Sequence, residues 1–193
     1  MLFKVFDSGI DCMVFVPSSD EVWAASGAAI NRLSTRVSHS LATSQPDTSF
    51  QTKGSLLRPI IEGSEVRDME TVYRDIWVAC QSGRITVYRD DGTFLRTFWA
   101  HESPILKMVP LGDYVWSIST ADCKVWKLQT AGFERYMVSC SHIFSSQEVN
   151  LPLIASTESF FTISQQNTPL KESFITVNEW TPSGMLKSRL ASN

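Results

Sequence analysis

Few residues of this chain have the type and spacing that could do chemistry, and His101 is the first of them. It is one of three histidines in the sequence. A histidine acts as a general base when a Ser or Cys nucleophile and an orienting carboxylate lie beside it. No such nucleophile can be argued beside His101 from the sequence. We therefore interpret His101 as a structural hydrogen-bonding residue, and we predict no catalytic residue and no enzyme.

Metal and cofactor chemistry is not indicated by the sequence either. The histidines His39 and His142 stand in polar, loop-like sequence, and scattered histidines make no metal cluster. The run Asp90-Asp91-Gly92 has two carboxylates, but a calcium loop needs further ligands and Asp-Gly is a common hairpin turn. We expect no metal and no cofactor. The four cysteines include no CxxC pair and lie at Cys12, Cys80, Cys123 and Cys140.

These residues are carried by a repeated pattern of short strands, which is clearest between Asp75 and Trp126. Apolar runs and stretches that alternate apolar with polar residues follow one another, separated by turn residues such as Gly83 and Gly92. Alternation with a period of two predicts half-buried strands. The pattern restarts after His101. The predicted strands of this stretch cover residues 76–80, 85–88, 93–98, 105–109, 114–119 and 123–126.

The same pattern occurs four times along the chain. An aromatic residue stands in the second predicted strand of each copy, and the spacings between these residues are 54, 39 and 45. A propeller blade of four strands takes about 40 to 45 residues. The four aromatic residues are Trp23, Trp77, Trp116 and Phe161, and we expect the three tryptophans to be buried.

The longer first spacing predicts an insertion, Thr35 to Gly63, which is rich in Ser, Thr and Gln. We expect one strand at residues 38–42 and a projecting loop over residues 43–63. The whole chain, 1–193, is predicted to form a single domain. Its predicted repeats cover residues 10–42, 66–98, 105–138 and 149–190.

This pattern resembles the WD-repeat and related β-propeller superfamily over about four fifths of the chain. The best copy runs from Gly92 to Leu128, with a His-containing turn and a strand that ends in Val125-Trp126. In that family, one His, one Ser or Thr, one Asp and one Trp can form a hydrogen-bonded tetrad. The other copies have no matching His. The resemblance implies that the tetrad residues here are His101, Ser119, Asp122 and Trp126.

The resemblance implies an all-β fold of about four propeller blades, each with four antiparallel strands. Two segments, residues 2–6 and 185–190, both resemble the outer strand of a last blade, so the predicted blades do not close on each other. We therefore expect an open or partial propeller. Its first and last blades would expose apolar faces, and such faces promote self-association.

Composition narrows the possible partners. The formal net charge is −3 and only 19% of the residues are charged, so nothing favours binding to nucleic acid or to an anionic membrane. No window approaches the roughly 18 apolar residues of a membrane span. The N-terminus alternates and carries early charge, unlike a signal peptide. Together with the cysteine pattern, these features predict a cytoplasmic protein.

The predicted function is a non-catalytic scaffold for protein–protein interaction, with partners of unknown identity. The predicted binding face consists of Arg84, Trp99, His101 and Glu102, because propellers place the turns that carry them at one end. The alternative is a regulatory propeller fragment of a larger enzyme. A Trp in the second strand followed by small residues is similar to the propellers of some inositol polyphosphate phosphatases and Rho exchange factors.

Overall fold

A computed structural model describes residues 9–35, 59–131, 134–145, 149–155, 159–167 and 173–192 of the chain. Every regular element in these residues is a β-strand, and the strands form four antiparallel sheets of four strands each. The predicted all-β fold is therefore confirmed. Within the described residues, no helix is long and apolar enough to cross a membrane.

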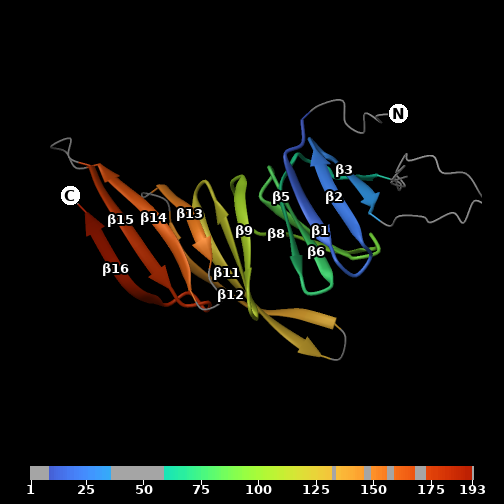
Figure 1. The fold of residues 1–193 in the computed structure, drawn as a ribbon. Coiled ribbons are helices and arrows are strands. Elements are labelled where there is room, and N and C mark those ends of the chain that lie inside the picture. Colours follow the sequence, from blue (N-terminus) through green and yellow to red (C-terminus); the bar gives the residue numbers. More distant parts are fainter. Residues whose placement is uncertain are drawn as a thin grey trace, which may run out of the picture.

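Each sheet is a simple meander in which sequential strands pair with one another. We call the four sheets blades 1 to 4 (Figure 1). Blade 1 comprises β1 (Cys12–Val16), β2 (Glu21–Ser26), β3 (Ala29–Ser34) and β4 (Ile60–Ile61). Blade 2 comprises β5 (Val66–Val72), β6 (Asp75–Cys80), β7 (Arg84–Arg89) and β8 (Phe94–Trp99).

The second half of the chain repeats this arrangement. Blade 3 comprises β9 (Ile105–Leu111), β10 (Tyr114–Ser119), β11 (Asp122–Ala131) and β12 (Glu134–Ser145). Blade 4 comprises β13 (Val149–Ala155), β14 (Phe160–Asn167), β15 (Ser173–Trp180) and β16 (Leu186–Ser192). The last strand of blade 3 runs beyond residue 138, where the sequence places the end of the third repeat.

The second-strand tryptophans occupy equivalent positions and are fully buried, as predicted. Trp23, Trp77 and Trp116 lie on β2, β6 and β10 and are at most 1% exposed. Their pairing partners on the third strands also correspond, because Trp77 pairs with Val87 and Trp116 pairs with Val125. The strand alternation of the sequence therefore places each of these rings on the same face of its blade.

The hydrophobic core lies between the blades, where aromatic rings meet edge to face or tilted. Trp23 of blade 1 contacts Tyr88 of blade 2 with ring centroids 6.2 Å apart. Trp116 of blade 3 contacts Trp180 of blade 4 at the same centroid distance, 6.2 Å. Between blades 2 and 3, Phe98 contacts both Trp77 and Trp126. Each second-strand tryptophan thus faces the blade that follows it.

The predicted loop at residues 43–63 is wrong at its C-terminal end. Ile60 and Ile61 form β4 and pair with β3, which completes blade 1. A two-residue strand carries too little alternation to be recognised in a Ser/Thr-rich segment. The strands predicted at residues 38–42 and 2–6 lie outside the described residues.

The four blades form an open arc. The first strands lie side by side along the inner side of the arc, because β1 contacts β5, β5 contacts β9 and β9 contacts β13. Blade 1 lies at the right-hand end and blade 4 at the left-hand end in Figure 1, with blades 2 and 3 between them. The prediction of an open or partial propeller is confirmed.

Candidate interaction face

His101 follows β8 of blade 2 and reaches into blade 3, where both of its ring nitrogens are engaged. Nδ1 contacts a carboxylate oxygen of Asp122 at the start of β11. Nε2 lies 2.7 Å from the hydroxyl oxygen of Ser117 on β10. The indole N–H of Trp126 on β11 donates to the same hydroxyl oxygen at 2.8 Å. These four residues form one continuous hydrogen-bonded chain, which we call the His101 network.

The serine of this network is Ser117, and not Ser119 as the sequence predicts. Both serines lie on the same side of β10, because side chains two residues apart point to the same face of a strand. Ser119 stands at the β10–β11 turn, where its hydroxyl contacts the Asp122 carboxylate at 2.5 Å and accepts the Asp122 backbone N–H at 2.9 Å. Ser119 therefore shapes the turn that presents Asp122 to His101.

The His101 network has the residue order of a Ser–His–Asp triad, but its position gives it a structural role. Ser117 is fully buried and His101 is 2% exposed. The Ser117 oxygen accepts the Trp126 N–H, so its own hydrogen is left to donate to His101 Nε2. His101 Nδ1–H then donates to Asp122. The network joins blade 2 to blade 3 and offers solvent no nucleophile.

Asp122 is held in its ionised form by this arrangement. Burial alone would raise its pKa, but the hydrogen bonds from Ser119 and His101 outweigh burial and hold the pKa of Asp122 below its usual value. Lys124 adds a positive charge, with its ammonium nitrogen 3.7 Å from the Asp122 carboxylate. The ionised carboxylate in turn orients the His101 ring.

Blades 1 and 2 are joined by a different buried group, Glu62, which follows β4. Its carboxylate accepts hydrogen bonds from the Tyr88 hydroxyl at 2.7 Å and from the Thr86 hydroxyl at 3.1 Å. Glu62 is 8% exposed. The Glu62 carboxylate thus joins blades 1 and 2 through buried hydrogen bonds, as His101 joins blades 2 and 3. Sequence reasoning missed Glu62 because it assigned this segment to a loop.

Blade 4 repeats half of the His101 network. The Trp180 indole N–H donates to the Thr162 hydroxyl at 2.9 Å. The pairing of β14 with β15 gives Thr162 and Trp180 the positions that Ser117 and Trp126 hold in blade 3. The signal that could have found this pair is a hydroxyl residue directly after the second-strand aromatic residue, as Ser117 follows Trp116 and Thr162 follows Phe161.

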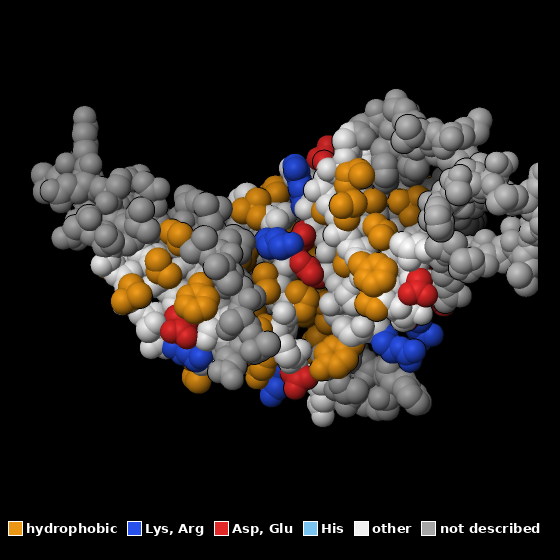
Figure 2. Space-filling view, in the orientation of Figure 1, with side chains coloured by type: hydrophobic (Ala, Val, Ile, Leu, Met, Phe, Trp, Pro, Cys, Tyr) orange, Lys and Arg blue, Asp and Glu red, His pale blue; other side chains and the backbone are white. Residues whose placement is uncertain are grey.

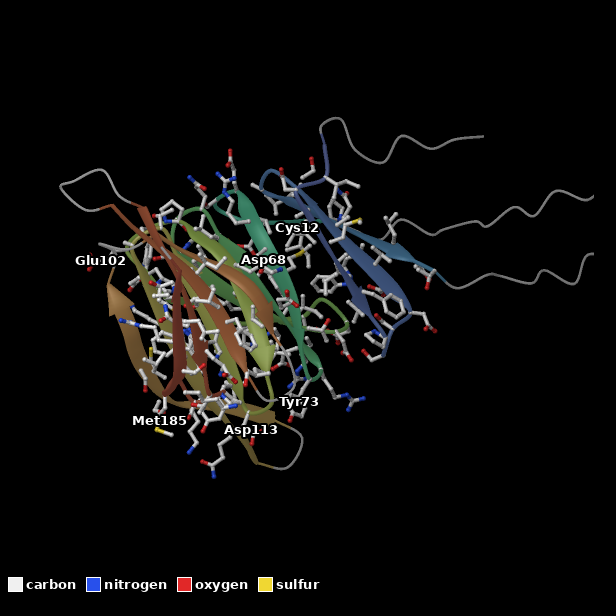
Figure 3. The ribbon with its side chains drawn as sticks, turned by 60° about the vertical axis from the view of Figure 1, so that its left-hand side comes forward. Cys12, Asp68, Tyr73, Glu102, Asp113 and Met185 are labelled. Atoms are coloured by element: carbon white, nitrogen blue, oxygen red, sulfur yellow. The ribbon has the colours of Figure 1, made fainter. Side chains whose placement is uncertain are left out.

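The inner strands β5 and β9 are joined by a partly buried cluster of three charged residues. The Lys107 ammonium donates to Asp68 at 2.8 Å and to Glu70 at 2.9 Å. Burial raises the pKa of Asp68 even though these hydrogen bonds oppose the change. Figure 3 shows Asp68 close to Cys12 where β1 and β5 meet.

Within the described residues, no group of three or more His, Cys, Asp or Glu side chains could hold a metal ion.

The loop that carries His101 also supports an exposed tryptophan. Trp99, the last residue of β8, is 70% exposed, and the Arg84 guanidinium lies over its ring at 5.7 Å from the centroid. Glu102 follows in the same loop and is exposed. Figure 3 shows Glu102 at one end of the sheets and Tyr73, Asp113 and Met185 at the other end. We call Arg84, Trp99 and Glu102 the Trp99 face.

Gly83 allows the two loops of this face to approach closely. The backbone N–H groups of Ala100 and His101 both donate to the Gly83 carbonyl at 3.0 Å. Gly83 has a φ of 85°, and a Cβ atom placed on it would lie 2.2 Å from the His101 carbonyl oxygen. Only glycine fits this position, so the turn before Arg84 and the loop after Trp99 are held as one unit.

Of the four residues predicted for the binding face, the structure keeps three at the surface and places one inside. Arg84, Trp99 and Glu102 lie together at the end of blade 2. His101 is buried, because both of its ring nitrogens are used between the blades. His101 therefore supports the Trp99 face from below and does not form part of its surface.

Comparison with known proteins identifies the fold through structure alone. No protein-family model matches the sequence, and no curated protein matches it. The computationally designed protein Ika4 has 16% identity and a TM-score of 0.60, with 93% of this chain and 95% of that chain covered.

Two natural propellers match at similar levels. U3-55K has 18% identity and a TM-score of 0.62, with 97% of this chain and 53% of that chain covered. The WD40 repeats of RRP9 have 15% identity and a TM-score of 0.61, with 97% of this chain and 64% of that chain covered. The chain therefore spans about half to two thirds of the length of these natural propellers. With its repeated blades and inter-blade network, the chain has a β-propeller fold similar to that of WD40 propellers, and its four blades form an open arc.

Proposed function

We propose that the chain is a protein-interaction scaffold that binds a protein partner through the Trp99 face. WD40 propellers are structural neighbours of the chain, and propellers of this kind serve as interaction scaffolds. The observation that carries the proposal is the exposure of Trp99, which is 70% accessible at the rim of blade 2. Trp77 of the same blade is 1% exposed and belongs to the core, so the exposure of Trp99 is not explained by packing between blades.

The composition of the Trp99 face supports this proposal. Trp and Arg are the residue types most enriched among those that dominate binding energy at protein interfaces. Arg84 already stacks on Trp99 with its guanidinium carbon 5.7 Å from the ring centroid, so the two side chains form one amphipathic surface. Its apolar part would pack against an aliphatic or aromatic side chain of the partner. Its guanidinium would donate hydrogen bonds to a carboxylate of the partner.

The rigidity of the base beneath this surface adds to the argument. The Gly83 carbonyl ties the loop of residues 100 and 101 to the β6–β7 turn, and the His101 network anchors that loop in blade 3. A surface that is already ordered loses less conformational entropy when a partner binds. The Trp99 face is therefore suited to a preorganised contact.

The experiment compares Trp99→Ala with Phe94→Ala in affinity capture from cell extract followed by mass spectrometry. Both residues are exposed aromatics on β8, but they lie at opposite ends of the strand. We expect the specific partners of the wild-type chain to be lost with Trp99→Ala and kept with Phe94→Ala. Thermal melting of both variants checks that each remains folded. Retention of every partner by Trp99→Ala would contradict the proposal.

The regulatory propeller of a larger enzyme, of the inositol polyphosphate phosphatase or Rho exchange factor type, stays a prediction. It would use the same face, with a catalytic domain on the same polypeptide as the partner.

A cytoplasmic location is proposed because the four cysteines are all free thiols, as a reducing compartment would keep them. Burial raises the pKa of both Cys12 and Cys80 to about 12, so these thiols stay protonated and unreactive at neutral pH.

A further inference from the structure

The two end blades of the arc carry faces that are built as blade-to-blade interfaces. Each internal interface uses the same positions of the repeat. In the second of the two blades that meet, one of these positions is the first-strand residue that pairs with the middle of the second strand. Met69 pairs with Val78 in blade 2, and Met108 pairs with Ser117 in blade 3. Met69 is 2% exposed and Met108 is fully buried, each against the preceding blade.

Met13 holds this same position in blade 1, because it pairs with Ala24 on β2. Its exposure is 61%. Cys12 and Val14, its neighbours on β1, pack into the core shared with blade 2, so alternation points Met13 and Phe15 to the opposite face. This face of blade 1 therefore has an interface residue where the described part of the chain places no blade.

The rest of this face is apolar or uncharged. Leu33 pairs with Val22, just as the interface residue Tyr88 pairs with Ile76 in blade 2. Ile61 is the neighbour of core residue Ile60 and is 69% exposed. Hydrophobic side chains gather over the part of the surface formed by β1 and β2 in Figure 2. We call Met13, Phe15, Val22 and Leu33 the entry face.

Blade 4 carries the complementary face at the other end of the arc. In blade 3, the residues that face blade 4 form one core cluster of Trp116, Ile118, Cys123 and Val125 together with Leu111. The pairing of β14 with β15 places Phe161, Ile163 and Val177 at the positions of Trp116, Ile118 and Cys123. These three residues of blade 4, which we call the exit face, repeat most of the apolar surface that the preceding blade presents at an internal interface. Glu179, which pairs with Phe161, stands at the position of Val125 and lies at the edge of this face.

We propose that a second copy of this chain covers both faces, with the exit face of each copy docked on the entry face of the other. The two faces have residues at the same repeat positions that meet at the three internal interfaces. By this correspondence, Phe161 would pack against Leu33 and Met13 of the second copy. Two such contacts related by a two-fold axis close a ring of eight blades. The ring covers every blade face, and exposed apolar faces of this kind otherwise favour aggregation.

Sedimentation velocity of the full chain tests this proposal. The expected species has twice the chain mass of 21.7 kDa. Met13→Glu and Phe161→Glu place a charge in the entry face and the exit face, and each should reduce the mass to that of one chain. Met185→Glu is the matched control, because Met185 is 66% exposed in the turn before β16 and lies outside both faces. It should leave the dimer unchanged.

Mixing the two monomeric variants tests the head-to-tail arrangement. One of the two contacts in a mixed pair joins the altered entry face of one chain to the altered exit face of the other, and the second contact is wild type on both sides. A dimer should therefore reappear in the mixture. Circular dichroism checks folding, and Val177→Glu replaces Phe161→Glu if that variant unfolds.

Three results would overturn the proposal. The first is a wild-type chain that sediments with the mass of one chain. The second is dissociation by Met13→Glu while Phe161→Glu and Val177→Glu both remain dimeric, which would indicate a symmetric contact between two entry faces. The third is a ladder of higher species in the wild type, which would indicate an open polymer.

Discussion

The Nε2 atom of His101 lies 2.7 Å from the Ser117 hydroxyl oxygen, and this hydrogen bond joins the end of blade 2 to the second strand of blade 3. Trp126 donates to the same oxygen, so a single buried hydroxyl links a loop and two strands. Buried polar groups that are fully satisfied add rigidity, whereas groups that lose a partner are costly. The Trp99 face therefore depends on a serine that never reaches the surface.

Ser117→Ala should destabilise the chain by about 1–3 kcal/mol, because it removes a buried hydroxyl that hydrogen-bonds both His101 Nε2 and the Trp126 N–H. Urea denaturation followed by tryptophan fluorescence measures this change. Trp126→Phe removes the N–H donor together with part of the buried ring, and the two substitutions should be strongly non-additive. Additive effects would show that Ser117 and Trp126 do not act as one network.

Asp122→Asn should destabilise the chain at neutral pH and lose its effect at acid pH. The pKa of Asp122 is below its usual value in the folded chain. Its contribution to stability is thus fully present above the unfolded-state value of about 3.9 and is lost as pH falls through the lower folded-state value. Denaturation of both proteins at a series of pH values measures the difference. A difference that does not change with pH would contradict the assigned role of the charge.

Trp77→Ala and Trp99→Ala should differ sharply although both remove an indole ring. Trp77 is 1% exposed between blades, and its loss should cost about 3–5 kcal/mol because it removes buried area and leaves a cavity. Trp99 is at the surface, and its loss should change stability by less than about 1 kcal/mol. Calorimetric melting compares the two. Equal losses would show that Trp99 also serves as a core residue.

Gly83→Ala should be more damaging than Gly27→Ala. Both glycines have positive φ values, 85° and 58°, and a non-glycine residue in such a conformation costs about 1 kcal/mol or more. A Cβ atom on Gly83 would also meet the His101 carbonyl oxygen at 2.2 Å, whereas nothing lies within 4 Å of a Cβ atom on Gly27. Similar melting temperatures for the two variants would show that the two loops are not held together at Gly83.

The sequence was sufficient to predict the strands and the register of the second-strand tryptophans. Alternation has a period of two in a strand, so an apolar face is visible in a single sequence. The burial of Trp23, Trp77 and Trp116 follows directly from it. The open arc could also be predicted, because residues 2–6 and 185–190 both resemble the outer strand of the last blade.

Other features could not be predicted because the sequence pattern was ambiguous or too short. Ser117 and Ser119 lie on the same side of β10, and only the strand pairing shows that Ser119 belongs to the turn. Glu62 follows a two-residue strand that looks like the end of a loop. The burial of His101 depends on the approach of blade 3, which is a tertiary contact that local residue patterns do not encode.

Hydrogen exchange of the chain with and without a captured partner, read by mass spectrometry, tests the location of the binding surface most directly. We predict that bound partner protects the backbone amides of residues 81–84 and 97–104, which form the Trp99 face and its supporting loops. The turn at residues 112–113 and the turn at residues 181–185 lie at the opposite end of the sheets and should exchange as in the free chain. Protection confined to those two turns would contradict the proposed function.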